Sequence, residues 1–118
     1  MIYGLGTDII EVERIRRAVA KQNFKDNVFT QAEQIYCNAR GKNSAASYAA
    51  RFAAKEAFFK ALGTGIILPL TDVEIINDDC GAPKIHLRGK IAALTGAKRI
   101  SLSLSHSKDF ATAVCIIE

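Results

Sequence analysis

The hydrophobic positions of the first half of the chain recur mostly at helical spacing. An apolar stretch at residues 2–7 predicts a short buried strand that ends near Thr7. Asp8 followed by Glu11 matches a capping box, in which the first side chain accepts a backbone N–H of the first helical turn. We therefore expect Asp8 to be the N-cap of a helix. Its apolar stripe would consist of Ile9, Val12, Ile15 and Val19.

Two more helices are predicted before residue 65. Thr30 and Glu33 repeat the capping-box signal and predict a helix that runs to about Arg40. A longer helix should cover residues 44–62. Gly63 would end it, because glycine accepts the left-handed conformation past a helix end.

The second half of the chain has the pattern of strands. Ile100, Leu102 and Leu104 alternate with serines, which predicts a half-buried strand. The other expected elements are strands at 72–76, 83–87 and 110–117, a turn at 78–81 and a short helix at 90–94. Helices mostly in the first half and strands in the second favour an α+β fold, with a long buried helix on a mainly antiparallel sheet.

Composition and charge narrow the classes of function. The chain has 118 residues and a net charge of +4, which suits one domain over residues 1–118 and hints at an acidic or phosphate-bearing partner. The charge excess is too small for a nucleic-acid tail, and no apolar run is long enough to span a membrane. Three scattered cysteines are typical of reduced thiols, so we expect a soluble, cytoplasmic protein.

The stretch RFAAKEAFFKALGTG places two charged residues in an apolar helix. Glu56 and Lys60 lie one turn apart, on a strip between alanines and the pair Phe52 and Phe59. An ordinary Glu–Lys pair on a helix surface explains their spacing. However, a carboxylate flanked by apolar side chains loses solvation, and it needs a cation or strong donors to stay ionised. Either Lys60 or a metal ion would serve.

Two other residues are candidates for chemistry. Asp8 is explained by helix capping alone, but together with Glu56 it would suit Mg²⁺, which uses few protein carboxylates and fills its octahedron with water and phosphate. His106 continues the register of the strand that begins at Ile100. It is either a histidine at the edge of the core or part of an anion site with Ser105, Ser107 and Lys108, and the pattern favours neither.

Four motifs, in order and over nearly the whole chain, resemble those of the holo-acyl-carrier-protein synthases, the small bacterial phosphopantetheinyl transferases. GLGTDIIEVERI is similar to the opening motif of that family, and FTQAE to its short second signature. RFAAKEAFFKALGTG is close to its longest and most specific motif, and SLSHS resembles its C-terminal serine-histidine motif.

The resemblance implies a reaction and the residues that perform it. The family moves the phosphopantetheine arm of coenzyme A to a serine of apo acyl carrier protein, in fatty acid biosynthesis, and releases adenosine 3′,5′-bisphosphate. Asp8 and Glu56 would bind Mg²⁺ with the pyrophosphate, and Lys60 would contact the phosphate and stabilise charge. Either Glu56 or a water at the metal would be the base for the carrier serine.

The resemblance also implies the residues that bind the two substrates. Arg51, His106 and Ser107 would hold the 3′-phosphate of coenzyme A. Lys42 would join them, Gly63 and Gly65 would let backbone approach the ligand, and Pro83 would lie near the adenine. The turn before Pro83 has Cys80 where the family commonly has asparagine.

A basic helix would receive the acidic carrier protein. Arg14 matches the family motif, and Arg17 and Lys21 rest on charge and helix position. The family is typically a homotrimer with active sites between subunits, so Arg51, His106 and Ser107 would reach the site of a neighbouring subunit. An apolar long helix would fit burial at such an interface.

Two rival functions come from other classes. A binding module that kept the fold without catalysis would have little need for Asp8, Glu56 and Lys60 together. A small nucleic-acid-binding domain would use the basic helix, but the chain lacks the aromatic and basic stripe expected of one.

Overall fold

The computed structural model describes all residues, 1–118, and confirms the α+β class. The strands are β1 (Gly4–Glu11), β2 (Val73–Asn77), β3 (Pro83–Leu87), β4 (Ile100–His106) and β5 (Phe110–Ile117). The α-helices are α1 (Val12–Val19), α2 (Gln22–Val28), α3 (Gln31–Asn38), α4 (Ser44–Leu62) and α5 (Gly89–Thr95). Short 3₁₀ turns occupy Gly41–Asn43 and Leu70–Asp72.

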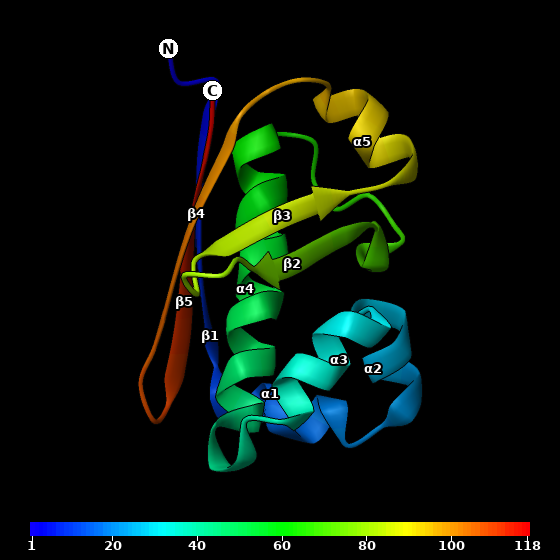
Figure 1. Ribbon diagram of the computed structural model, residues 1–118, viewed down its shortest axis with the longest axis vertical. Coiled ribbons are helices and arrows are strands. Elements are labelled where there is room, and N and C mark those ends of the chain that lie inside the picture. The colour runs from blue at the N-terminus through cyan, green and yellow to red at the C-terminus, as the bar shows by residue number, and fades with distance from the viewer.

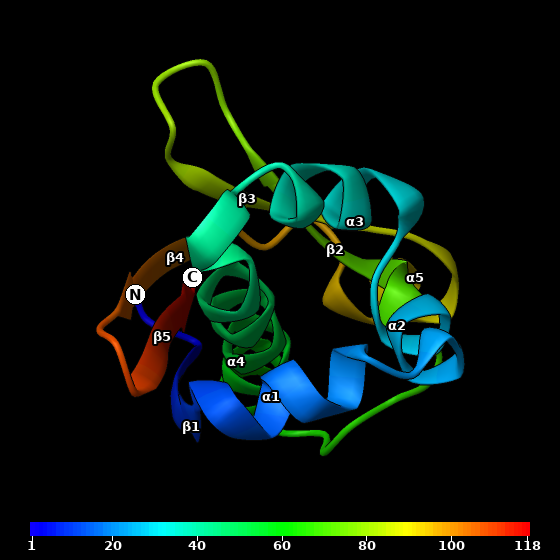
Figure 2. The same ribbon diagram turned by 90° about the horizontal axis from the view of Figure 1, so that it is seen from below.

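The long helix α4 is the centre of the molecule. An antiparallel sheet in the order β1-β5-β4 covers one side of α4 (Figure 1), and the β2–β3 hairpin crosses it on another side. Seen along α4, helix α1 closes the remaining side together with the α2–α3 region (Figure 2). None of the helices combines the length and hydropathy needed to cross a membrane.

The strand β1 lies against α4 with almost no space between the two backbones. A Cβ added to Gly4 would stand 1.8 Å from the carbonyl oxygen of Ala61, and one added to Gly6 would stand 2.0 Å from that of Ala57. Glycines in β1 and alanines in α4 therefore allow the two backbones to approach closely. Any larger side chain at these positions would push the strand and the helix apart. This approach brings the residues that follow Gly6 close to the last turns of α4.

The predicted N-cap at Asp8 is wrong, as is the strand end near Thr7. Every residue from Gly4 to Glu11 pairs with β5, Asp8 opposite Ala113, and α1 begins only at Val12. Ile9 faces away from α4 and is 65% exposed, so it does not belong to a helical stripe. Pairing with β5 satisfies backbone groups that sequence spacing alone assigned to a helix.

Other boundaries agree with the sequence pattern. Thr30 and Glu33 form the expected capping box at the start of α3. Helix α4 ends at Gly63, which has a φ of 83°. Helix α2 was not predicted, because its seven residues carry only two apolar side chains, Phe24 and Val28.

The apolar composition of α4 is explained within one chain. Most of its residues, on all sides, are buried against the sheet, α1, α3 and β2. The apolar character of α4 therefore gives no separate support for a subunit interface, which stays a prediction.

Helix α4 also buries a lysine that the sequence analysis did not single out. The ammonium group of Lys55 donates to Glu33 Oε1 at 2.9 Å and to the carbonyl oxygens of Val28 at 2.5 Å and Leu70 at 3.1 Å. Burial lowers the pKa of Lys55, and the charge of Glu33 partly opposes that shift. The pair ties α3 and α4 together in the core.

Candidate active site

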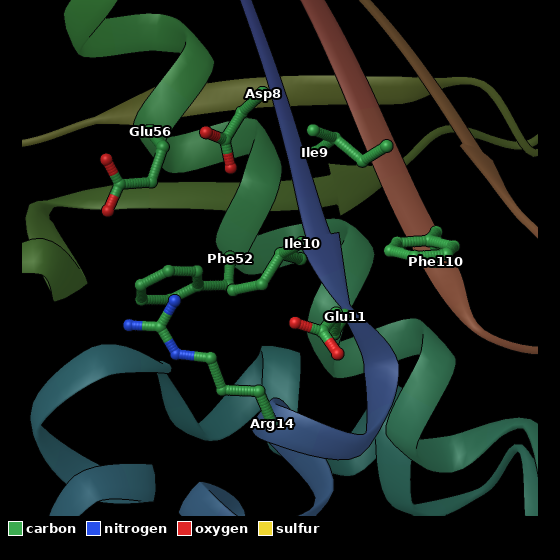
Figure 3. Close-up of a pocket in the computed structure, with 8 residues that line it drawn as sticks. All are labelled: Asp8, Ile9, Ile10, Glu11, Arg14, Phe52, Glu56 and Phe110. Carbon is green, nitrogen blue, oxygen red and sulfur yellow. The ribbon is translucent and has the colours of Figure 1, made fainter.

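Two carboxylates that are distant in sequence meet at the edge of the sheet. Asp8 lies on β1, which is an edge strand, and Glu56 lies on α4 directly behind it. Figure 3 shows both carboxylates extending into the same space. Alternation along β1 directs Asp8 toward the helix, so the strand that replaces the expected helix start is what brings Asp8 to Glu56.

Lys60 joins Asp8 rather than Glu56. Its ammonium group donates to Asp8 Oδ1 at 3.1 Å and to the carbonyl oxygen of Thr7 at 3.0 Å, and its side chain is 55% exposed. The interpretation of Glu56 and Lys60 as an ordinary pair along the helix is therefore wrong. The position of β1 beside the last turns of α4 gives Lys60 a nearer carboxylate.

Glu56 has no hydrogen bond or ion pair to any residue of the chain, although it is half-buried. Burial raises the pKa of Glu56, and the negative charge of Asp8 raises it further. Lys60 and Arg14 act in the opposite direction. A divalent cation between the two carboxylates would remove the repulsion that causes part of this shift.

A cavity of about 330 Å³ opens beside the two carboxylates. Arg14, from α1, points its guanidinium group toward it, next to the ring of Phe52 (Figure 3). The lining residues are Asp8, Ile9, Ile10, Glu11, Arg14, Phe52, Glu56 and Phe110. The capping-box spacing indicated a helix-capping role for Glu11, so its place at this cavity was not predicted. Only knowledge of the full length of β1 would have indicated that position.

The two carboxylates fit a magnesium ion that keeps other ligands. The structure brings together no cluster of three or more histidine, cysteine or acidic side chains that could hold a metal ion. The Asp8–Glu56 pair would therefore supply two ligands, and the remaining ligands would come from water or substrate. Mg²⁺ is commonly held by one or two carboxylates, with water and substrate phosphates completing an octahedron. The unpaired, partly desolvated Glu56 is the kind of oxygen ligand that such an ion stabilises.

Three of the residues expected to bind coenzyme A share a second cavity, of about 440 Å³. Lys42 comes from the 3₁₀ turn before α4, and His106 and Ser107 come from the end of β4. His106 is exposed, so it is not part of the core. Lys108, expected beside this anion site, lines the same cavity, and Arg16, which was not expected there, adds further positive charge.

Arg51 lies apart from that cavity. It is 3% exposed, bonds to Asn77, and lines a smaller cavity of about 120 Å³ beside β2. Pro83 pairs with Asn77 across the β2–β3 hairpin, so it lies near Arg51. Gly63 and Gly65 follow α4 with φ values of 83° and 71° and have open space around them. Within one chain, the expected coenzyme A ligands therefore form separate groups.

The predicted basic residues share one face, but Lys21 lies outside the helix, because α1 ends at Val19 and Lys21 is the N-cap of α2. Arg14, Arg17 and Lys21 line a shallow depression of about 510 Å³ next to the carboxylates. Glu13 bonds to Arg16 and Arg17 and offsets part of their charge. The face remains positive and borders the space in front of Asp8 and Glu56, because Arg14 lines both cavities.

Comparison with known proteins connects this geometry to one family. Residues 4–115 match the model of the 4′-phosphopantetheinyl transferase superfamily. The holo-[acyl-carrier-protein] synthase of Fusobacterium nucleatum is 45% identical over 99% of both chains. That of Geotalea daltonii is 44% identical over 100% of this chain and 99% of the relative.

Solved structures agree over the full length. The holo-(acyl-carrier-protein) synthase of Bacillus anthracis, solved in complex with CoA (3′,5′-ADP), superposes with a TM-score of 0.84. It is 37% identical and covers 100% of this chain and 97% of its own. The synthase of Neisseria meningitidis gives a TM-score of 0.88 at 37% identity, over 100% and 99% of the two chains.

Proposed function

We propose a function for this chain on the premise that it belongs to the 4′-phosphopantetheinyl transferase superfamily. It is a holo-[acyl-carrier-protein] synthase, which transfers the 4′-phosphopantetheine group of coenzyme A to a serine of apo acyl carrier protein and releases adenosine 3′,5′-bisphosphate. The observation that carries the assignment is the meeting of Asp8, Glu56 and Lys60 beside one open cavity.

The residues of this cavity suit the transfer of a phosphoryl-linked group. Such a reaction needs alignment and cancellation of negative charge more than covalent help from the protein. Asp8 and Glu56 would hold Mg²⁺ together with the pyrophosphate of coenzyme A. When bound, the ion would supply charge that neutralises the phosphate oxygens. Lys60 stands beside Asp8 with an exposed ammonium group and would bind the same phosphate.

Coenzyme A would be held outside the carboxylate cavity by basic residues. Arg51, His106 and Ser107 would hold its 3′-phosphate, and Lys42 would join them. Within one chain, Lys42, His106 and Ser107 form one group and Arg51 another. Gly63, Gly65 and Pro83 would leave room for the ligand along the end of α4 and the β2–β3 turn. Arg14, Arg17 and Lys21 would receive the acidic carrier protein.

We propose a homotrimer in which active sites form between subunits. The cavity with Glu56 and the cavity with His106 share no lining residue in one chain. The outer face of the three-stranded sheet exposes large apolar side chains: Leu5 at 63%, Ile9 at 65% and Val114 at 40%. Several large apolar side chains exposed on one face of a sheet are typical of a protein interface. Packing of this face would bring groups from neighbouring chains to one site.

Three free cysteines, Cys37, Cys80 and Cys115, support a reducing compartment. We therefore place the reaction in the cytoplasm, and we assign it to fatty acid biosynthesis through its acyl carrier protein substrate.

The function is tested by the mass of the carrier protein. The chain is incubated with apo acyl carrier protein, coenzyme A and Mg²⁺, and the carrier is weighed by intact mass spectrometry. We expect a gain of one phosphopantetheine that a chelator prevents. No gain with several carrier proteins would refute the transferase, and a gain that survives the chelator would refute the magnesium assignment.

A further inference from the structure

The Arg51 side chain is buried, but its hydrogen-bonding capacity is only partly used. It is 3% exposed, and its Nε has no hydrogen-bond partner. Its guanidinium carbon lies 4.1 Å from the ring centroid of Tyr36, and its Nη2 donates to Asn77 Oδ1 at 2.5 Å. No carboxylate pairs with it, so its positive charge has no anion within the chain.

The Nε edge of the Arg51 guanidinium is therefore free to donate a hydrogen bond to a bound anion. A buried N–H without a partner costs free energy, and a guanidinium binds phosphate through several parallel donors. Arg51, Tyr36 and Asn77 line the same cavity of about 120 Å³. Tyr36 and Asn77 contact Arg51 from two sides and hold its side chain in one position.

Asn77 also connects Arg51 to the β2–β3 turn. Its Nδ2 donates to the carbonyl oxygen of Gly81 at 2.9 Å, and it pairs with Pro83 as the last residue of β2. The turn itself is held by Asp78, whose Oδ1 accepts from the backbone N–H groups of Cys80 and Ala82, both at 2.9 Å. One asparagine therefore bonds at the same time to the arginine and to the turn.

We propose that Asn77 is a positioning residue for phosphate recognition, acting through Arg51 with help from the Tyr36 ring. The inference rests on the proposed function, in which Arg51 binds the 3′-phosphate of coenzyme A. An arginine that is already ordered loses less rotamer freedom when it binds, so affinity for the phosphate rises. Asn77 thereby sets how strongly the enzyme prefers coenzyme A to dephospho-coenzyme A, which lacks only that phosphate.

The test measures steady-state kinetics of the Asn77→Ala variant with both compounds and saturating apo acyl carrier protein. We expect KM for coenzyme A to rise about tenfold, the size expected for one charge-assisted hydrogen bond, while kcat changes little. KM for dephospho-coenzyme A should stay within about twofold, because the missing phosphate is the group that Arg51 would bind. The exposed Asn27, which makes no side-chain hydrogen bond, provides the matched control Asn27→Ala, and neither KM should change.

A double-mutant cycle separates positioning from general structural damage. If Asn77 acts through Arg51, Asn77→Ala should add almost nothing to KM for coenzyme A in an Arg51→Ala background. Additive effects would overturn the proposal, as would equal increases of KM for both compounds. If Asn77→Ala melts below the assay temperature, Tyr36→Leu keeps apolar bulk and should show the same loss of preference for coenzyme A.

The wild-type enzyme distinguishes the failure of this inference from the failure of the proposed function. A wild-type chain that modifies the carrier equally well from both compounds would refute recognition of the 3′-phosphate and leave the transferase intact. A wild-type chain that modifies no carrier at all would refute both.

Discussion

Glu56 is a side chain whose position favours ligand binding over stability. Burial and the charge of Asp8 raise its pKa above the ordinary value of 4.5, so the ionised form is less favourable in the folded chain than in the unfolded chain. This destabilisation is present above the raised pKa and disappears as the pH falls below 4.5. Removing the charge should therefore increase stability near neutral pH.

We expect Glu56→Gln to unfold at a higher urea concentration than the wild type at pH 7 without metal. The difference should shrink at pH 4, below the ordinary value of 4.5, because the Glu56 carboxyl is then mostly protonated in both the folded and the unfolded chain. In the same variant, Mg²⁺-dependent turnover should fall by about a hundredfold. Full activity would contradict the metal assignment, and a stability gain of the same size at both pH values would contradict the charge argument.

Lys55 and Lys60 lie on the same helix but differ in environment. Lys55 is 1% exposed and paired with Glu33, so Lys55→Met would leave a buried carboxylate without its cation. We expect Lys55→Met to lower the free energy of unfolding by about 3–5 kcal/mol. The matched variant Lys60→Met changes an exposed side chain and should cost less than about 1 kcal/mol. Urea titration of both variants measures the two free energies of unfolding. An equal loss in both would refute the conclusion that Lys55 supports the core and Lys60 does not.

The contact of β1 with α4 is the element-scale feature on which the site depends. A Cβ on Gly6 would lie 2.0 Å from the carbonyl oxygen of Ala57, so Gly6→Ala must separate the strand from the helix. We expect it to cost about 1–3 kcal/mol or more in thermal or chemical unfolding, and to lower turnover because Asp8 moves away from Glu56. Lys84→Ala, at an exposed position of β3 in the other sheet, is the control and should stay within about 0.5 kcal/mol. Wild-type stability in Gly6→Ala would show that the two elements separate at little cost.

Helix α1 is the element that we expect to orient the carrier protein. Arg14→Glu should raise KM for apo acyl carrier protein about tenfold or more and change KM for coenzyme A much less, because the acidic carrier meets reversed charge. Arg17→Glu should also raise KM for the carrier protein more than KM for coenzyme A, but by a smaller factor, since Arg17 does not line the carboxylate cavity. The control is Lys90→Glu, which makes the same charge change at an exposed position of α5 and should alter neither KM. Equal losses for both substrates would rule out docking on α1.

At the scale of the whole molecule, the outer face of the three-stranded sheet should decide the oligomeric state. Val114 lies in the middle of that face and is 40% exposed. We expect Val114→Glu to convert a trimer to monomers in light scattering after size-exclusion chromatography, because interface formation would bury the new charge. Leu94→Glu changes an exposed apolar residue on α5, outside the sheet, and should leave the mass unchanged. A wild-type monomer at micromolar concentration would refute the trimer.

The sequence pattern predicted most of the fold, but it missed helix α2 and assigned the stretch from Asp8 to Glu11 to the wrong element. Helix α4, the α3 capping box and the β4–β5 hairpin carry local signals, namely glycine after a helix, a Thr–Glu pair and strict alternation. The stretch from Asp8 to Glu11 carries two local signals at once, a capping box and apolar spacing, and both indicated a helix. Pairing with β5, at the other end of the chain, decides that it is a strand.

The sequence by itself determined the α+β class, the long helix and, through its motifs, the residues Asp8, Glu56 and Lys60. These depend on residue type and on spacing within a few turns, which the chain carries locally. Only the tertiary structure decided that Lys60 bonds to Asp8 and leaves Glu56 unpaired, that Lys55 is buried with Glu33, and that Asn77 holds Arg51. Each of those contacts joins elements that are far apart in sequence, so it exists only after β1, α3 and β2 have packed around α4.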